Sequence, residues 1–337
     1  MTAHSDREDP RPRPASVFDV AKAAGVSHQT VSRVLNDHPS LRDATRQKVL
    51  LAMRELNYRP NAAARALSSS RSRMIGILST SSGEYGPASS VAAVETAARS
   101  RGYSVTIANA DGLDPQSINE AVNHLANLAA EGLVVVAPQT RVLAALSELS
   151  IGIPFITLQA TGSDTPDGPQ LDQVVGARLA TQHLVELGHH RIGHIAGPPE
   201  WLDASQRLTG FRDELGQHGL DAGFVASGDW SAASGHRAAI ELLGRGVTAI
   251  FVGNDQMALG ALSAATGARL EVPGDLSIVG FDDVPEAAFY HPPLTTVRQD
   301  LALAGRRAVA LLLGESDAVP SVHPQLIVRA STAPPRR

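Results

Sequence analysis

Apolar residues recur along this chain with two different spacings, and the change of spacing divides it into two regions. Up to about residue 60, apolar positions return every three or four residues, which is typical of small amphipathic helices. From Met74 on, short apolar, β-branched runs alternate with helical stretches, which predicts parallel α/β sheets covered by helices on both faces. The expected strands are Met74–Ser79, Ser104–Ala108, Leu133–Val136, Pro154–Leu158, Arg191–Ala196, Ala249–Val252 and Leu276–Phe281. The clearest helices between them are Val91–Ser100, Gly176–Leu187, Ala204–His218 and Asp255–Ala265.

The first region predicts three short helices. Ser16 precedes an acidic first turn and acts as an N-cap for a helix over Val17–Ala24, and Gly25 ends that helix. Ser27 caps a second helix after only one further residue, and a third covers Asp43–Leu56. Two short helices joined by a tight turn with glycine are typical of a helix-turn-helix.

The second helix, within "VSHQTVSRVLN", has one apolar and one polar face. Val31, Val34 and Leu35 share the apolar face. The opposite face carries Gln29, Ser32, Arg33 and Asn36. This polar face is either a solvated surface or a surface that reads the major groove, where an amide and a guanidinium fit adenine and guanine edges. We favour the second interpretation.

Composition limits the class of protein. The 337 residues are 43% hydrophobic but only 4% aromatic, which is enough for two or three domains with cores of Ala, Val and Leu. There is no cysteine, which excludes disulfides, thiolate metal sites and cysteine nucleophiles. The charged, Pro-rich N-terminus has no apolar signal region, and no apolar run is long enough to span a bilayer. We therefore expect a soluble, cytoplasmic protein with no membrane partner.

Charge is distributed unevenly. Residues 1–73 hold 13 Lys and Arg against 7 Asp and Glu, a net charge of +6, whereas the remaining residues carry −11. A basic head on an acidic body suggests a polyanion as the partner of the head.

The connection between the regions, "NYRPNAAARALSSSRSR", contains one more short helical pattern. Pro60 stops the third helix, and Asn61 can cap Ala62–Ser68. Seven residues are marginal as a helix in water. The segment is therefore either a plain connector or a helix that folds only on a suitable surface.

Several motifs together resemble the LacI-type family of sugar-responsive repressors, over about Ser16 to Val328. They are "DVAKAAGVSHQTVSRVLN", "ELNYRPNAAARAL", "GDWSAASG", "NDQMALGAL" and "VGFDD…PPLTTVRQD". The resemblance implies a body of two periplasmic-binding-protein-like subdomains. It also implies that two hinge helices pair in the minor groove, where each inserts a leucine that matches Leu67. The DNA-binding residues expected from the pattern and the resemblance are Ser16, Ser27, His28, Gln29, Thr30, Ser32, Arg33, Asn36, Asn61, Ala64 and Leu67.

A ligand site is expected in the body, because polar side chains follow several predicted strands. Asn254 and Asp255 follow one strand, and Asp282 and Asp283 follow another. In parallel α/β folds, ligands bind beyond the carboxyl ends of the strands. Carboxylate, amide and guanidinium groups near an aromatic plane suit sugars. With the resemblance, the expected effector-binding residues are Tyr85, Pro87, Gln159, Leu171, Asp203, Arg207, Trp230, Asn254, Asp282 and Gln299.

Three of these positions depart from a galactoside-binding pattern within the family. Where such a member has an aspartate, a phenylalanine and a serine, this chain has Gln159, Leu171 and Asp203. The effector therefore need not be a β-galactoside.

Other chemistry lacks support in the sequence. The histidines of "HLVELGHHRIGH" have metal-like spacing, but no acidic partner is suitably placed, and a structural role is favoured. No dinucleotide, Walker A or G-x-S-x-G motif is present. We expect no enzyme activity, no cofactor and no metal.

The sequence thus predicts a helix-turn-helix head and an α/β body of two parallel-sheet subdomains. The expected divisions are a tail (1–15), the head (16–60), a hinge (61–73), subdomains of 74–171 with 301–328 and of 172–297 within a body of 74–330, and a final tail (331–337). The function expected is that of a dimeric repressor of a palindromic operator, controlled by a small sugar or glycoside. A dimer is favoured over a tetramer because no C-terminal heptad helix follows. The alternative is a sugar-binding receptor without a DNA role.

Overall fold

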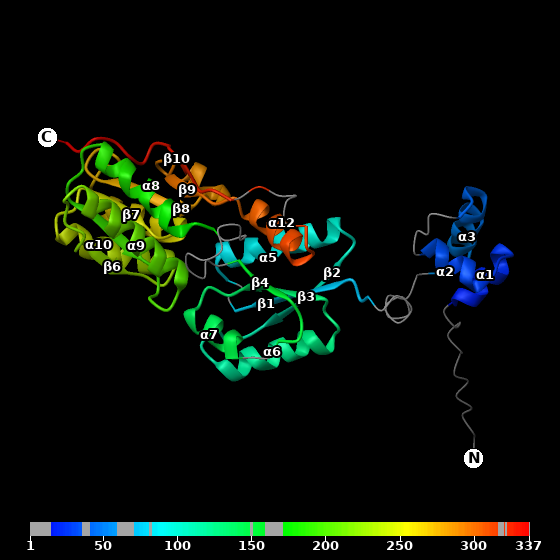
Figure 1. Ribbon diagram of the computed structural model, residues 1–337. Coiled ribbons are helices and arrows are strands. Elements are labelled where there is room, and N and C mark those ends of the chain that lie inside the picture. Colours follow the sequence, from blue (N-terminus) through cyan, green and yellow to red (C-terminus); the bar gives the residue numbers. More distant parts are fainter. Residues whose placement is uncertain are drawn as a thin grey trace, which may run out of the picture. The chain divides into compact units, whose positions relative to one another are not determined.

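The computed structural model describes residues 15–35, 41–58, 71–80, 83–148, 151–158, 171–315, 320 and 322–336. The chain forms two units, Met1–Ser72 and Arg73–Arg337, called here the head and the body (Figure 1). The expected hinge helix and the candidate positions Asn36, Asn61, Ala64, Leu67 and Gln159 lie outside the described residues.

The head is a three-helix unit as predicted, with the third helix ending one residue earlier than expected, at Glu55. Helices α1 (Val17–Ala24), α2 (His28–Leu35) and α3 (Asp43–Glu55) enclose a small core of buried aliphatic side chains. That core is formed by Val20, Ala21, Val31, Val34, Val49 and Ala52. The apolar face predicted for α2 is thus the face that packs inward.

The turn between α1 and α2 follows from its caps. Ser16 and Asp19 form a reciprocal capping box, in which the Asp19 amide donates to Ser16 Oγ (3.3 Å) and the Ser16 amide to the Asp19 carboxylate (2.8 Å). Gly25 ends α1 with φ of 66°, a left-handed conformation that costs glycine little. The Thr30 amide then donates to Ser27 Oγ (3.1 Å), which begins α2.

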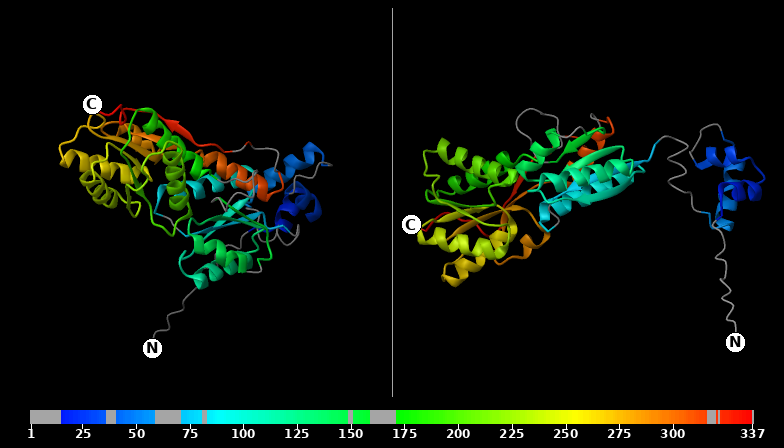
Figure 2. Two further views of the ribbon diagram at one scale, coloured as in Figure 1. Left: turned by 60° about the vertical axis from the view of Figure 1, so that its left-hand side comes forward. Right: turned by 90° about the horizontal axis from the view of Figure 1, so that it is seen from below.

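The body contains two sheets, each lying between two layers of helices (Figure 2). The first sheet has the strand order β2-β1-β3-β4 and is entirely parallel. Its strands are β1 (Met74–Ser79), β2 (Ser104–Asn109), β3 (Gly132–Val136) and β4 (Phe155–Thr157). The second sheet has the order β10-β9-β8-β7-β5-β6. Its strands are β5 (Ile192–Ala196), β6 (Val225–Ser227), β7 (Ala249–Val252), β8 (Ser277–Asp282), β9 (Thr295–Arg298) and β10 (Gln325–Ile327).

Helices from distant parts of the sequence cover the first sheet. Side chains of α5 (Tyr85–Ser100) and α12 (Leu301–Leu312) form the core on one face, and those of α6 (Pro115–Asn127) and α7 (Thr140–Glu148) form the core on the other. We call this half of the body lobe 1. Figure 1 shows α12 beside α5, although some 200 residues separate them.

The second sheet is covered in the same way and forms lobe 2. One face packs against α8 (Gln173–Glu186) and α9 (Leu202–Gln217), and the other against α10 (Ala232–Gly244) and α11 (Asp255–Gly267). A short 3-10 helix, η1 (Pro285–Phe289), follows β8. The predicted α/β class with two parallel-sheet lobes is confirmed.

The structure differs from the sequence expectation at several elements. Helix α5 begins at Tyr85 and not at Val91, because Pro87 lies in the first turn, where backbone N–H groups need no helical partner. Strands β6, β9 and β10 were not predicted, since each is short and includes polar residues, so none stands out as an apolar run. Strand β10 pairs antiparallel with β9, so this part of 301–328 lies in the sheet of lobe 2 and not in lobe 1.

The expected C-terminal tail is bound to lobe 2. Ser331 is fully buried, its hydroxyl donates to the Ile278 carbonyl (2.6 Å), and it accepts from the Thr295 amide (2.8 Å). The Ala333 amide donates to Ser277 Oγ (3.0 Å). Residues 331–333 are therefore part of the folded body.

Candidate functional site

The polar face predicted on α2 is exposed. Ser27, His28, Gln29 and Arg33 are exposed, and Thr30 and Ser32 are half-buried. The side chains of Val31 and Val34 point into the core and fix this orientation. An exposed amide and guanidinium one turn apart can meet base edges in a groove.

Three of the predicted DNA contacts also have structural bonds. Besides its bonds as a cap, Ser16 donates its hydroxyl to Asp19 (2.6 Å). The hydroxyls of Ser27 and Thr30 are 2.9 Å apart and share a hydrogen bond. These side chains stabilise the start of their helices, and a contact with phosphate would be an additional role.

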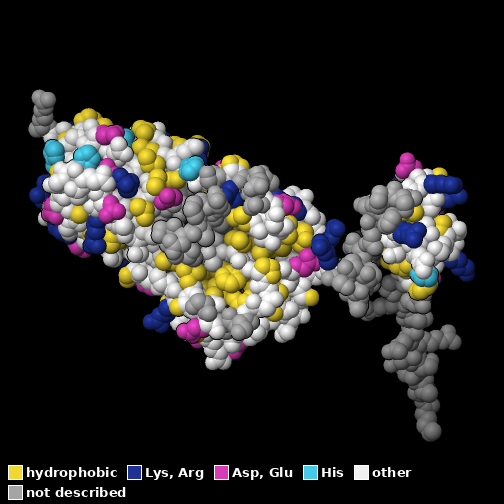
Figure 3. Space-filling view, in the orientation of Figure 1, with side chains coloured by type: hydrophobic (Ala, Val, Ile, Leu, Met, Phe, Trp, Pro, Cys, Tyr) yellow, Lys and Arg dark blue, Asp and Glu magenta, His cyan; other side chains and the backbone are white. Residues whose placement is uncertain are grey.

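The described part of the head is basic. It carries Lys22, Arg33, Arg42, Arg46, Lys48, Arg54 and Arg71 against Asp19, Asp43 and Glu55. Figure 3 shows basic side chains at several places on the visible face of the head. This excess of positive charge suits a polyanion.

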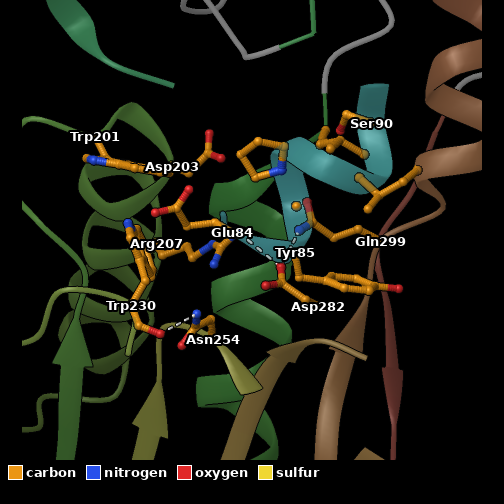
Figure 4. Close-up of a pocket in the computed structure, with 14 residues that line it drawn as sticks. Glu84, Tyr85, Ser90, Trp201, Asp203, Arg207, Trp230, Asn254, Asp282 and Gln299 are labelled. Carbon is orange, nitrogen blue, oxygen red and sulfur yellow. Dashed lines mark hydrogen bonds and ion pairs between the residues drawn. The ribbon is translucent and has the colours of Figure 1, made fainter. Parts of the chain in front are cut away.

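A pocket in the body brings nine of the ten predicted effector residues together (Figure 4). It has about 470 Å³ of empty space, part of it open to solvent. The predicted residues that line it are Tyr85, Pro87, Leu171, Asp203, Arg207, Trp230, Asn254, Asp282 and Gln299. Gln159, the tenth, lies outside the described residues.

Four buried side chains form a closed ring of hydrogen bonds at this pocket, called here the pocket ring. Arg207 Nε donates to Gln173 Oε1 (2.9 Å), and Gln173 Nε2 donates to Gln299 Oε1 (2.8 Å). Gln299 Nε2 donates to Asp282 Oδ1 (2.8 Å), which also accepts from Arg207 Nη2 (3.4 Å). All four residues are between 2% and 8% exposed. Because each member makes two bonds of the ring, a change in one affects the orientation of the others.

The charge of the ring is balanced between Arg207 and Asp282. Burial raises the pKa of Asp282 to about 6, although the Arg207 guanidinium and the Gln299 amide lower it. The guanidinium also lies 3.9 Å from the centre of the Phe281 ring and donates to the Gly253 carbonyl. Arg207 is thus fixed in place before any ligand arrives.

The backbone at the end of β8 is unusual. Asp282 and Asp283 have φ values of 104° and 53°, in the region that disfavours side chains. Asp283 forms ion pairs with Arg298 (2.7 Å) and Arg329 (2.6 Å). These pairs hold the turn, so Asp283 has a structural role while Asp282 lines the pocket.

The aromatic wall of the pocket depends on a loop held by Asn254. Asn254 Nδ2 donates to the Trp230 carbonyl (3.1 Å), and Oδ1 accepts from the Met257 amide (2.8 Å) as the cap of α11. Trp230 has φ of 72° and packs edge-on against Trp201, with ring centres 5.3 Å apart. A Cβ on Gly197 would overlap the Trp230 ring, so glycine is required there.

Asp255 lies away from the pocket. Its carboxylate accepts from Thr296 Oγ1 (2.6 Å) and from the Val284 amide (2.9 Å) inside lobe 2. Burial raises its pKa to about 8. The suggestion that Asp255 joins the ligand site is therefore wrong.

The histidines of "HLVELGHHRIGH" bind protein groups. His183 Nε2 lies 2.9 Å from Thr332 Oγ1, and His189 Nε2 lies 2.9 Å from the Ala333 carbonyl oxygen, so both hold the C-terminal segment. His194 is stacked between Phe211 and Phe251, with ring centres 5.0 and 4.6 Å away. Across the described ranges there is no cluster of side chains suited to a metal ion.

The sequence did not indicate some of the pocket residues. Those missed are Gln173 in the ring and Glu84, Ser90, Trp201 and Leu301 in the lining. Only Gln173 could have been noticed in the sequence, because it is a long polar side chain on a buried face of α8 made otherwise of small and apolar residues. Glu84, Trp201 and Leu301 lie at helix starts, where hydrophobic periodicity gives no information, and Ser90 is a small residue within α5.

Family comparisons agree with this division into head and body. Residues 16–61 match the model of bacterial regulatory proteins of the lacI family, and residues 181–332 match a periplasmic binding protein-like domain. In the parts of the chain that are described, no helix is both long and apolar enough to cross a bilayer.

Similar proteins are bacterial repressors. The lactose operon repressor of Escherichia coli K12 is 36% identical over 304 residues, which cover 89% of this chain and 84% of that protein. The ribose operon repressor of the same strain is 35% identical, with 89% and 92% covered. The repressor PurR of Proteus mirabilis is 36% identical over 95% of this chain and 97% of its own length.

Solved structures show the same architecture. The lac repressor dimer bound to operator and the anti-inducer ONPF superposes with a TM-score of 0.83 at 35% identity, covering 95% of this chain and all of that one. A complex of the regulator CelR with cellobiose gives a TM-score of 0.68 at 30% identity, with 94% and 99% covered.

Proposed function

Because this chain belongs to the lacI family of bacterial regulatory proteins, we propose that it binds operator DNA as a homodimer and that a small sugar-like effector in the body pocket controls this binding. It acts in the cytoplasm as a repressor. The observation that carries the proposal is that nine effector positions, expected from separate parts of the sequence, line one pocket.

The head supports the DNA-binding half of the proposal. The exposed side chains of Gln29 and Arg33 stand on a helix whose opposite face is packed into the core. In a helix-turn-helix the second helix enters the major groove, and two subunits related by a two-fold axis read two half-sites. The operator is therefore a roughly palindromic duplex.

The pocket supports the effector half. Trp230 supplies an apolar plane, and the pocket ring supplies fixed donors and acceptors, which together suit the C–H faces and hydroxyls of a sugar. The polar atoms of Asn254 are already engaged, so this residue acts mainly by holding Trp230. Arg207 and Asp282 are the residues expected to contact hydroxyls directly.

The alternative of a sugar receptor without a DNA role is not supported. Residues 16–61 match the regulatory family, and the relatives in these comparisons are repressors and not enzymes.

The experiment that tests the proposal uses the full chain. A duplex selected from random DNA serves as the operator, and a sugar library is screened for ligands that change both the melting temperature and operator affinity. Arg207→Ala and Asp282→Ala should abolish this response while leaving operator binding intact, because each removes a charge-assisted bond at a site outside the head. Loss of operator binding in both variants, or an unchanged effector response, would contradict the assignment.

A further inference from the structure

Two acidic residues, Glu84 and Asp203, form one end of the pocket. We infer that these two carboxylates form an acidic subsite that accepts hydrogen bonds from the effector and rejects an anionic group. The effector is therefore a polyhydroxylated molecule that is neutral or carries an amine, and not a sugar phosphate or a sugar acid. The inference rests on the proposed function of the same pocket.

The first argument is the balance of charge. Four charged side chains line the pocket: Glu84, Asp203, Arg207 and Asp282. Arg207 forms its ion pair with Asp282 and also donates hydrogen bonds to Gln173 and to the Gly253 carbonyl. Among the described residues, neither Glu84 nor Asp203 takes part in an ion pair. Two carboxylates thus face the pocket without a cation of their own.

The second argument is an unsatisfied atom. Asp203 is the second residue of α9, and the residue at the N-cap, Trp201, makes no side-chain cap bond. The Oδ1 atom of Asp203 is buried and has no hydrogen-bond partner in the described part of the chain. Leaving a buried acceptor unpaired is costly, so such atoms at a pocket mark places where a ligand donates.

A neighbouring aromatic residue shows the same feature. The indole Nε1–H of Trp230 is also buried without a partner among the described residues, and Trp230 is only 7% exposed. Two residues that line the pocket thus carry, respectively, a buried acceptor and a buried donor without a partner. A hydroxyl, which donates and accepts, can satisfy both kinds of atom.

The position of the carboxylates suits one end of a small ligand. Figure 4 shows the carboxyl groups of Asp203 and Glu84 on the same side of the pocket, and Tyr85 and Gln299 on the opposite side. The pKa of Asp203 is raised, because the effect of burial outweighs the lowering by the nearby Arg207 charge. A hydroxyl pair or an ammonium donating to Asp203 would stabilise the carboxylate, whereas a phosphate there would add like charge.

Matched ligands test the inference on the full chain. Neutral sugars, their 1- and 6-phosphates, the corresponding uronic acids and the 2-amino sugars are screened by thermal shift, and each hit is measured by calorimetry against its neutral parent. We expect every hit to be neutral or amine-bearing, with phosphates and acids at least about 100-fold weaker, because like-charge juxtaposition is strongly unfavourable. The amino sugars show whether an ammonium or a hydroxyl is the preferred donor.

Charge-neutral variants assign the effect to the two residues. Asp203→Asn and Glu84→Gln keep the shape and should each reduce the discrimination between a neutral ligand and its phosphate by about 10-fold or more. Asp213→Asn, an exposed position on the same helix as Asp203, is the matched control and should not change it.

The possible failures are distinguishable. A phosphate or an acid that binds as tightly as its neutral parent would overturn the acidic subsite but leave a sugar-controlled repressor. If Asp203→Asn and Glu84→Gln both discriminate between a neutral ligand and its phosphate as the wild type does, the acidic subsite is likewise overturned, and a sugar-controlled repressor remains. If no compound of any class changes stability or operator affinity, the proposed function itself fails, and the acidic subsite with it.

Discussion

The pocket ring links four residues by hydrogen bonds, so that replacing one of them changes the bonds of its neighbours. Each of Gln173, Arg207, Asp282 and Gln299 makes two bonds within it, and Gln173 and Gln299 are 126 positions apart. Gln173 stands where the chain enters lobe 2, and Gln299 stands where it leaves lobe 2 for α12. Gln173 contacts Arg207 directly and is a positioning residue for it.

Replacing Gln173 should therefore weaken effector binding without touching the ligand. Gln173→Leu leaves Arg207 Nε and Gln299 Oε1 without partners, which should cost about 1–3 kcal/mol of body stability and weaken the effector by about 10-fold or more. Urea unfolding and calorimetry measure the two effects. Gln182→Leu, on the exposed face of the same helix, is the control. Lower stability with unchanged effector affinity would show that Gln173 is only structural.

A second residue-scale prediction concerns His194. Its Nδ1–H donates to the Phe251 carbonyl (3.0 Å), and complete burial lowers its pKa to about 3. In the unfolded chain a histidine titrates near 6.5. The neutral form is thus favoured by folding, and the stability that it contributes is full above pH 6.5 and is lost as the pH falls from 6.5 toward 3.

The variant His194→Gln keeps a donor for Phe251 but cannot titrate. Its unfolding free energy should decrease less on acidification than that of the wild type, with a difference in slope of up to about 1.4 kcal/mol per pH unit between pH 6.5 and 4. Both tryptophans, Trp201 and Trp230, lie in the body, so their fluorescence reports its unfolding. The exposed His124→Gln controls for removing an imidazole. Equal slopes in wild type and variant would contradict this account.

At the scale of elements, one face of α2 packs into the core of the head, and we expect the opposite face to recognise DNA. Gln29→Ala and Arg33→Ala should each lose about 1–3 kcal/mol of discrimination between the operator and unrelated DNA, since both side chains are exposed and neither supports the core. Competition binding measures the difference. Gln47→Ala, at an exposed position of α3, should not change it. Equal losses on operator and random DNA would mean that Gln29 and Arg33 contact only phosphates.

Elements with strong periodicity or clear caps could be predicted from the sequence, and short ones could not. The bounds of α1 followed from Ser16 and Gly25, and those of β1 from its continuous apolar run. Strand β10 has three residues and is an antiparallel edge, so neither length nor alternation marked it. Its pairing with β9 forms only in the tertiary structure and cannot be read from the local sequence.

The candidate site shows the same limit. Positions after strand ends or in recognisable motifs, such as Asp282 and Trp230, were found, because topology and family resemblance both point to them. Glu84 was missed because the start of α5 was placed six residues too late. The pocket ring could not be predicted from the sequence. Its bond between Gln173 and Gln299 joins two connections between the lobes that are far apart in the sequence and come together only in the folded body.

At the scale of the whole molecule, lobe 2 is held together by contacts between its beginning and its end. His183 and His189, early in the lobe, bind Thr332 and Ala333 near the C-terminus. Strand β10 and residues 331–333 pack on the same sheet. The chain leaves lobe 2 after β9, forms α12 in lobe 1 and returns to the sheet of lobe 2 at β10.

The last prediction is that effector and operator affinity are coupled reciprocally. If the effector weakens operator binding by a given factor, operator must weaken effector binding by the same factor, typically about 5- to 150-fold.

We expect the segment 61–68 to gain amide protection on operator, because a seven-residue helix is not stable by itself. Leu67→Ala should reduce operator affinity and DNA bending together, while effector affinity in the free protein is unchanged. Leu56→Ala, a half-exposed leucine of the head, is the control. Calorimetry measures operator binding with and without effector, and effector binding with and without operator. Affinities that do not change in the presence of the other ligand, or strong protection of 61–68 without DNA, would refute this coupling.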